Sequence, residues 1–202
     1  MAHLVLYDFP RSSNARKVRM AMAEKGITCE KVTVDLAAGA QRKPDYLKLN
    51  PHGKVPTMVI DGTPIYESTA IIEYLEETHP NPPLMPKDPV ARARVRAIEE
   101  VIDSNFMGAL RLVRINTMVR PAAERNEKEI EEGKRQIAWH NEWLDRELQG
   151  RQFLGGDLFS VADIAAFCQI GFQRALRVEI DPKFKNLTAW WSRVDARPSS
   201  KA

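Results

Sequence analysis

The sequence has few cysteines and lacks a long apolar run. Its two cysteines, Cys29 and Cys168, lie far apart and form no Cys-x-x-Cys pair, so we expect two buried thiols in a reducing compartment. The longest nearly apolar stretch, residues 161–172, contains Asp163 and Gln169 and is too short to cross a bilayer. No signal segment with a charged, an apolar and a small-residue region opens the chain. These absences predict a cytoplasmic protein that does not enter a membrane.

Several catalytic motifs are also absent. The sequence contains no P-loop, no G-x-G-x-x-G after a strand, no H-E-x-x-H and no G-x-S-x-G, which argues against kinases, dehydrogenases and many hydrolases. The four histidines, His3, His52, His79 and His140, show no ligand spacing, so we expect no metal site. The net charge of +3 is small, and no aromatic residues alternate with the basic ones, so we expect no nucleic-acid partner.

Proline is concentrated near the middle of the chain. Residues 79–89 hold five of the 13 prolines, a density that neither a helix nor a central strand accepts. We therefore expect an interdomain linker there, between a first domain at residues 1–78 and a second at residues 90–202.

The two sides of this linker have different periodicities. Before it, β-branched runs at residues 4–7, 30–34, 57–60 and 64–66 predict strands, and helical patterns cover residues 13–25 and the stretch from Ser68. Asp61-Gly62 is a strong hairpin signal between the last two strands. After the linker only helical patterns remain, with an apolar stripe at Ile130, Ile137 and Leu144. The prediction is an α/β first domain followed by an all-helical domain.

Three short segments of the first domain could bind a ligand. Ser12 and Ser13 stand at a predicted helix start, where a serine either caps the helix or donates a hydrogen bond to an anion or thiolate. Val55-Pro56 precedes a strand, and a cis bond there would let the Val55 backbone pair with an extended peptide. Glu67 precedes the helix that starts at Ser68, so it could meet an ammonium group while the helix terminus holds a carboxylate. Together these groups suit a short peptide thiol.

The stretch NPHGKVPTMVIDGTPIYESTAIIEYLEE resembles the glutathione-binding segment of cytosolic glutathione transferases. SVADIAAF and WWSRVDARP are similar to two further segments of that family, and the likeness extends over essentially the whole chain. The resemblance implies a thioredoxin-like first domain, a helical-bundle second domain and a cis Val55-Pro56 bond. It also implies a homodimeric detoxification enzyme in which glutathione is a co-substrate and its thiolate attacks a small hydrophobic electrophile.

The segment FPRSSNARKVR resembles the serine-type classes theta, phi and zeta. The match makes Ser12 the first candidate for thiol activation, with Ser13 and Tyr7 as alternatives. Zeta enzymes, which include maleylacetoacetate isomerases, have cysteine where this chain has Asn14. The glutathione-binding residues that the resemblance implies are Ser13, Asn14, Gln41, Arg42, Lys54, Val55, Pro56, Glu67 and Ser68.

The second domain carries weaker expectations. Asp103 could reach the glutathione of a partner subunit, as acidic residues there do in some classes of the family, although a solvated helix charge is the favoured interpretation. We hypothesise that Phe106, Met107, Leu110 and Met118 contribute to an apolar wall for the electrophile, with core packing as the alternative for each. Other functions remain open: a glutathione-dependent disulfide reductase or peroxidase, an enzyme similar to maleylacetoacetate isomerase, and a non-catalytic interaction protein with the same fold.

Overall fold

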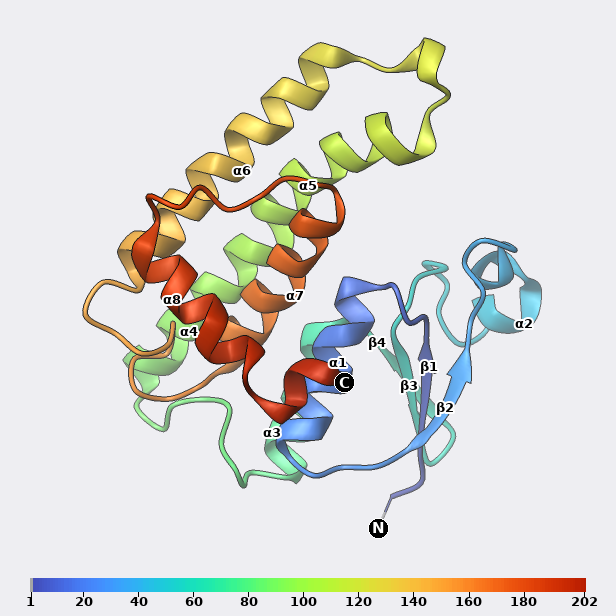
Figure 1. The fold of residues 1–202 in the computed structure, drawn as a ribbon. Coiled ribbons are helices and arrows are strands. Elements are labelled where there is room, and N and C mark those ends of the chain that lie inside the picture. Colours follow the sequence, from blue (N-terminus) through green and yellow to red (C-terminus); the bar gives the residue numbers. More distant parts are fainter. Residues whose placement is uncertain (1) are drawn as a thin grey trace. The chain divides into compact units, whose positions relative to one another are not determined.

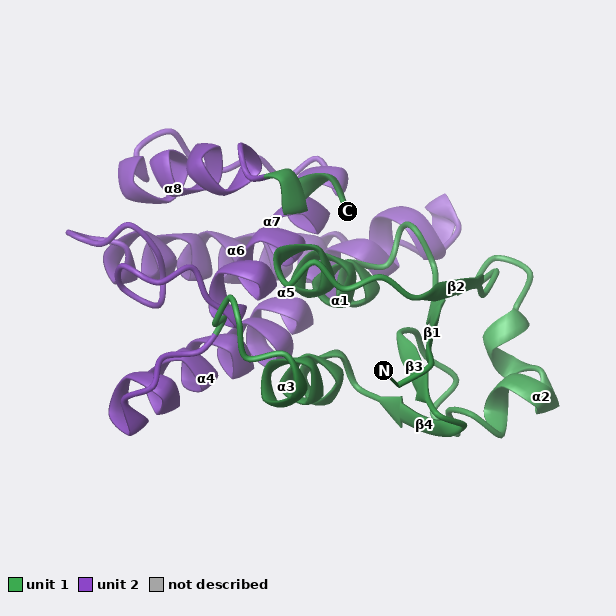
Figure 2. Ribbon diagram, turned by 90° about the horizontal axis from the view of Figure 1, so that it is seen from below, with its two compact units in different colours: residues 1–84, 198–202 green, residues 85–197 purple. Residues whose placement is uncertain are grey.

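The computed structural model describes residues 2–202, which form two compact units (Figures 1 and 2). Of the described residues, unit 1 comprises 2–84 and 198–202, and unit 2 comprises 85–197. The structure confirms the predicted fold class, a thioredoxin-like α/β unit and an all-helical unit. The domain and linker boundaries expected from the sequence remain a prediction.

A four-stranded mixed sheet forms the centre of unit 1. Its strands are β1 (Leu4–Asp8), β2 (Glu30–Thr33), β3 (Thr57–Ile60) and β4 (Thr63–Tyr66), in the order β2-β1-β3-β4. β2 is parallel to β1, whereas β3 is antiparallel to both β1 and β4. The β3–β4 turn is at Asp61-Gly62, as predicted, and both residues have positive φ angles of 47° and 85°.

Helices cover both faces of this sheet. α1 (Ser13–Glu24) and α3 (Ser68–Thr78) lie on one face, and the short α2 (Pro44–Leu47), which follows η1 (Ala40–Arg42), lies on the other (Figure 2). The alternation along β1 explains this arrangement, because Leu4, Leu6 and Asp8 point to the α1 face and the intervening Val5 and Tyr7 to the opposite face.

A buried ion pair attaches the residues after α3 to the rest of unit 1. Lys25, the C-cap of α1, places its Nζ 2.6 Å from Glu76 Oε2. The same ammonium group donates to the carbonyl oxygens of His79 at 2.7 Å and Pro82 at 3.0 Å. Glu76 also accepts from the Leu84 N–H. The proline-rich segment is therefore held through its backbone.

The end of the described chain returns to unit 1. η5 (Pro198–Lys201) packs against α1 and has the colour of unit 1 in Figure 2. Arg16 Nη2 donates to the Ser200 carbonyl at 2.7 Å, and the Ser199 hydroxyl bonds Glu24. This segment completes one side of α1.

Unit 2 is helical throughout its regular elements. These are α4 (Pro89–Val101), η2 (Ile102–Phe106), α5 (Met107–Arg114), η3 (Ile115–Val119), η4 (Ala122–Glu124), α6 (Glu127–Glu147), α7 (Val161–Ala175) and α8 (Lys185–Asp195). η2 and η3 are π-helical turns, which continue α4 into α5 and end α5. Within residues 2–202 no helix is both long and apolar enough to cross a membrane.

α7 is buried along most of its length, as its apolar sequence predicts. At its start the buried Asp163 accepts hydrogen bonds from the N–H groups of Ser160 and Leu154 and from the indole N–H of Trp190 on α8, at 2.8–2.9 Å. Burial raises the pKa of Asp163 and these bonds oppose that shift. Ser160 and Asp163 form a capping box at the start of α7, and these contacts assign Asp163 to folding.

Candidate functional site

The strand register brings the candidate segments to one end of the unit 1 sheet. Tyr7 on β1 is opposite Thr57 on β3, and Thr57 is opposite Tyr66 on β4. The end of β1, the start of β3 and the end of β4 are therefore neighbours. The segments that extend from this end contain Ser12 and Ser13, then Lys54, Val55 and Pro56, then Glu67 and Ser68.

Ser12 is the N-cap of α1. Its Oγ accepts from the Ala15 N–H at 3.2 Å, and its backbone carbonyl accepts from Arg16 N at 2.9 Å. Because the hydroxyl oxygen is the acceptor in this cap, its own proton stays available for donation to a ligand. Capping and ligand binding are thus compatible roles for the half-buried Ser12.

The neighbours of Ser12 add polar groups at the same helix terminus. Ser13 and Asn14 are the first two residues of α1, and both are half-buried. The first turn of α1 contains no acidic side chain, so the positive end of the helix dipole is not offset by a carboxylate there. This terminus therefore suits an anionic ligand atom.

A buried ion pair that the sequence did not predict supports the turn before Ser12. Arg19 Nη1 lies 2.6 Å from Asp8 Oδ1, and Nη2 donates to the Pro10 carbonyl at 3.2 Å. Both side chains are about nine-tenths buried, at 9% and 11% exposure. The contact fixes the path of the chain from β1 to α1. Arginine at this position of an amphipathic helix is ordinary, so the sequence carried no signal for the pair.

Val55-Pro56 forms a cis peptide bond, as the resemblance implies. Both residues are buried, and Val55 packs with Val34 and Tyr46. Within residues 2–202, no hydrogen bond uses the N–H or the carbonyl of Val55. The Lys54 side chain next to it is exposed. A peptide ligand could therefore pair with the Val55 backbone without displacing an internal bond.

Glu67 adopts an unusual backbone conformation at the start of α3. Its φ angle is 68°, a region that glutamate rarely occupies and that costs on the order of 1–3 kcal/mol. Its side chain is exposed, and α3 has no side-chain cap. The buried Ser68 is the first residue of the helix, where N–H groups lack partners within the helix. Carboxylate and ammonium groups of a ligand fit this pair of features.

Tyr7 has a different environment from Ser12. It faces the α2 side of the sheet, where its ring meets that of Tyr46 edge-on at a centroid distance of 6.0 Å. It belongs to the apolar cluster around Val34, Tyr46 and Val55. This placement favours Ser12 over Tyr7 as the thiol activator, which is also the order that the sequence favours.

Gln41 and Arg42 lie in η1, beside the turn that leads to Val55. A Cβ atom on Gly53 would lie 3.0 Å from the Gln41 carbonyl oxygen, so the two backbone segments are in close contact. Gln41 is half-buried, with its Oε1 buried and without a partner in the described chain, and Arg42 is exposed. A role in glutathione binding remains a prediction for both.

The unit 2 residues that were expected to contact an electrophile or a partner's glutathione differ in burial. Phe106 and Leu110 are fully buried, and Phe106 stacks on His140 at 5.3 Å, so core packing explains Phe106. Met107 is half-buried, and Met118 on η3 is 58% exposed. Asp103 lies in the π-helical turn η2. Contact of these side chains with an electrophile or a partner's glutathione remains a prediction.

Two residues that the sequence motifs did not indicate, Tyr46 and Asn50, bond the Lys54 carbonyl through their side chains. The available signal was Asn50-Pro51 followed by Gly53, since asparagine before proline favours a turn with side-chain bonds to nearby backbone.

No metal site is evident in the part of the chain that the structure describes. Residues 2–202 contain no cluster of histidine, cysteine or acidic side chains that could hold an ion.

Comparison with known proteins places this geometry in a family. Residues 6–83 match the glutathione S-transferase N-terminal domain and residues 107–198 the C-terminal domain. Mouse maleylacetoacetate isomerase is 34% identical over 88% of this chain and 82% of its own length. The probable maleylacetoacetate isomerase of Caenorhabditis elegans is 52% identical over half of this chain and 47% of its own length.

A solved structure extends the comparison to three dimensions. The theta class glutathione S-transferase from Xanthomonas axonopodis pv. citri, crystallised with glutathione bound, superposes with a TM-score of 0.89. The two chains are 29% identical, with 100% of this chain and 96% of that chain covered. The chain therefore belongs to the glutathione S-transferase family and carries both of the family's domains. It is an enzyme of the glutathione transferase type.

Proposed function

We propose that this protein binds glutathione at the end of the unit 1 sheet and activates its thiol with Ser12. The observation that carries this proposal is the convergence of three unsatisfied groups: the Ser12 hydroxyl proton, the Val55 backbone and the uncapped start of α3. Glutathione has a thiol, an extended peptide backbone and a γ-glutamyl group with both charges, so each of these groups has a partner in it.

The chemistry required of Ser12 is modest. A free thiol with a pKa of about 8.5 is only a few per cent thiolate at pH 7, and a pKa of about 6.5 raises that fraction to about three quarters. The difference corresponds to about 2.7 kcal/mol. One hydrogen bond to a charged sulfur contributes roughly 1.5–3 kcal/mol, and a helix N-terminus adds about 0.3–1 kcal/mol. Ser12 needs no general base, because it donates a hydrogen bond and does not itself attack.

The acceptor of the thiolate is the second part of the proposal. A small hydrophobic electrophile, a homodimer and a cytoplasmic location are expected from the family resemblance, and the two free cysteines suit a reducing compartment. A specific alternative is an isomerase that acts on maleylacetoacetate, because relatives with that name reach 36% identity over 88% of the chain. Asn14, in place of the cysteine of zeta enzymes, weighs against this alternative.

Titration of the bound glutathione thiol, followed by thiolate absorbance, tests the role of Ser12. We expect the wild type to show a lowered pKa and Ser12→Ala to return it towards that of the free thiol. Since alanine also removes the helix cap, Ser12→Asp is the matched variant: aspartate keeps a capping oxygen but has no proton to donate. Ser12→Thr keeps both functions and should behave as the wild type does.

Other results would contradict parts of the proposal. If Ser12→Ala titrates as the wild type does, Ser12 is not the activator, and Ser13→Ala and Tyr7→Phe are the next variants. If the wild type does not bind glutathione, the proposed function is wrong. Turnover of maleylacetoacetate above that of aryl halides would favour the isomerase, and turnover of mixed disulfides or hydroperoxides would favour a reductase or peroxidase.

A further inference from the structure

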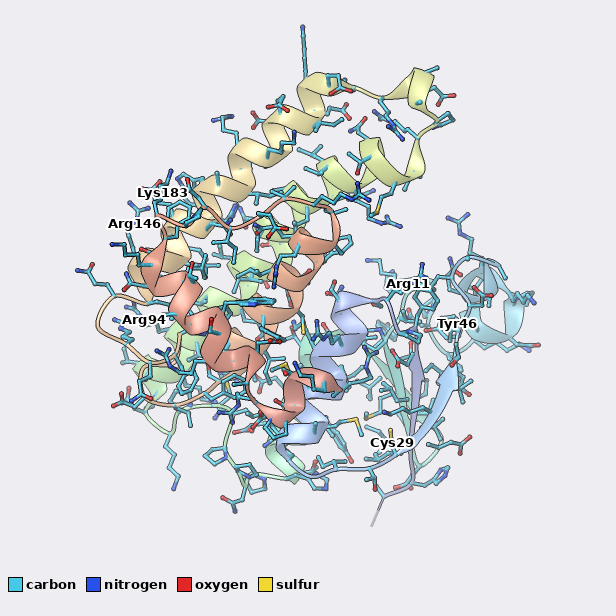
Figure 3. The ribbon with its side chains drawn as sticks, viewed as in Figure 1. Arg11, Cys29, Tyr46, Arg94, Arg146 and Lys183 are labelled. Carbon is cyan, nitrogen blue, oxygen red and sulfur yellow. The ribbon has the colours of Figure 1, made fainter. Side chains whose placement is uncertain are left out.

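Buried side chains hold the carbonyl group that precedes Val55. The Lys54 carbonyl oxygen accepts from the Tyr46 hydroxyl at 2.5 Å and from Asn50 Nδ2 at 2.9 Å. Tyr46 and Asn50 are both buried, at 7% and 1% exposure. Figure 3 labels Tyr46 near α2, from which it reaches this turn. Two hydrogen bonds use both lone pairs of this one carbonyl oxygen.

The protons of this network can be assigned from its acceptors. A carbonyl only accepts, so the Tyr46 proton points to Lys54, and the Thr57 hydroxyl, 2.9 Å away, donates to the Tyr46 oxygen. Asn50 Oδ1 accepts from the His52 N–H at 3.0 Å, which fixes the amide orientation and leaves both Nδ2 protons for Lys54 and Thr57. Burial raises the pKa of Tyr46, and the bond with Thr57 opposes this shift, so the hydroxyl keeps the proton that it donates.

Planarity transmits this constraint to the ligand side of the turn. The Lys54 carbonyl and the Val55 N–H belong to one peptide group, and that peptide is trans because the cis bonds of the described chain are Val55-Pro56 and Asn81-Pro82. In a trans peptide the C=O and N–H vectors point in opposite directions. Holding the carbonyl against Tyr46 and Asn50 therefore directs the Val55 N–H away from them, and this N–H has no partner in residues 2–202.

We propose that Tyr46 and Asn50 are positioning residues for peptide recognition, because their bonds to the Lys54 carbonyl orient the Val55 N–H towards a carbonyl of the bound peptide. The inference rests on the proposed function, in which that peptide is glutathione. Neither side chain needs to touch the ligand. Both act through one peptide plane, so their effect should depend on the ligand carbonyl that the Val55 N–H meets.

The experiment measures the dissociation constants of two probes by calorimetry: glutathione, and its pseudopeptide in which a CH₂ group replaces the cysteinyl carbonyl. We expect Tyr46→Phe and Asn50→Ala each to weaken glutathione binding about five- to tenfold, as loss of one orienting hydrogen bond suggests. The pseudopeptide should bind these variants as weakly as it binds the wild type. The thiol titration of bound glutathione should be unchanged, because neither residue acts on the sulfur.

Two matched variants separate positioning from general loss of structure. Tyr74→Phe removes a tyrosine hydroxyl from α3, where the described chain gives it no hydrogen bond, and should leave both affinities unchanged. Thr57→Val removes a hydroxyl that bonds Tyr46 and Asn50 but not Lys54, so it should weaken glutathione binding less than Tyr46→Phe does.

The outcomes distinguish this inference from the proposed function. If the wild type binds glutathione and Tyr46→Phe binds it equally well, the positioning role is wrong and the proposed function survives. Equal losses for glutathione and the pseudopeptide also overturn the inference, because they show that the variants disturb the site as a whole. If the wild type does not bind glutathione, the proposed function fails and the inference fails with it.

Discussion

Replacing Lys25 with methionine is expected to destabilise unit 1 by about 3–5 kcal/mol, the usual cost of removing one partner from a buried ion pair. Methionine keeps most of the length of the side chain but has no donor. The Glu76 carboxylate, 7% exposed, would lose the ammonium group that lies 2.6 Å from it. The carbonyl groups of His79 and Pro82 would lose the donor that serves both of them.

The expected loss of stability is large because the Lys25 ammonium group uses all three of its donors. Its three protons meet three acceptors at 2.6, 2.7 and 3.0 Å, so no donor is unused in the folded state. Whole domains have unfolding free energies of about 5–15 kcal/mol, so a loss of about 3–5 kcal/mol is a large part of the total. Lys48→Met is the matched control, because Lys48 pairs with Asp45 on the surface at 74% and 95% exposure, where pairs contribute about 0–1 kcal/mol.

The chain provides separate spectroscopic probes for the measurement. All four tyrosines lie in unit 1 and all four tryptophans in unit 2. Urea unfolding followed by tyrosine absorbance therefore reports on unit 1, and tryptophan emission on unit 2. A loss for Lys25→Met no larger than that for Lys48→Met would refute the reasoning. The double variant Lys25→Met with Glu76→Leu should recover part of the stability, since it also removes the buried carboxylate that pairs with Lys25.

Three further predictions concern pH and close packing. Burial lowers the pKa of His140, the one histidine in the unit 2 sequence, and its Nδ1–H bond to a backbone carbonyl partly opposes the shift. In the unfolded state this histidine therefore binds a proton more readily than in the folded state. The free energy of unfolding of unit 2, followed by tryptophan emission, should fall as pH drops below about 6.5, by at most about 1.4 kcal/mol per pH unit. His140→Phe should flatten this slope. Gly133→Ala on α6 would place a Cβ 2.8 Å from Val113 Cγ2 on α5, and we expect a loss of about 1–3 kcal/mol by urea unfolding; an increase in stability would contradict this contact. Gly53→Ala combines a φ of 59° with a Cβ 3.0 Å from the Gln41 carbonyl oxygen. It should therefore lower the free energy of unfolding by about 1–3 kcal/mol and weaken glutathione binding measured by calorimetry. Unchanged affinity would contradict close packing of this turn.

The elements of the fold were largely predictable because their periodicity is a local property. The alternation in β1, the Asp61-Gly62 turn and the buried stripe of α6 each follow from neighbouring residues. The π-helical turns η2 and η3 were not predicted. A single extra residue in a helical turn leaves almost no trace in a short hydrophobic pattern.

The site was predictable only in part. The residues at helix starts and at Val55-Pro56 carry sequence signals, because caps and proline turns restrict residue type. Tyr46 and Asn50 act through a carbonyl several residues away, and that contact depends on the folded path of the turn. The Arg19–Asp8 pair likewise joins a helix to a strand, and its partners are identifiable only when both elements are placed.

The position of η5 in unit 1 has a consequence for the order in which the protein is made. Ribosomes add about 5–20 residues per second, and domains commonly fold as they emerge. Residues 198–202 pack on α1 but are synthesised after all of residues 85–197. During synthesis the nascent α1 therefore lacks its contacts with Ser199 and Ser200, and the surface that η5 later covers is open to chaperones. Most of unit 1 is therefore synthesised before unit 2, but unit 1 is completed only after unit 2.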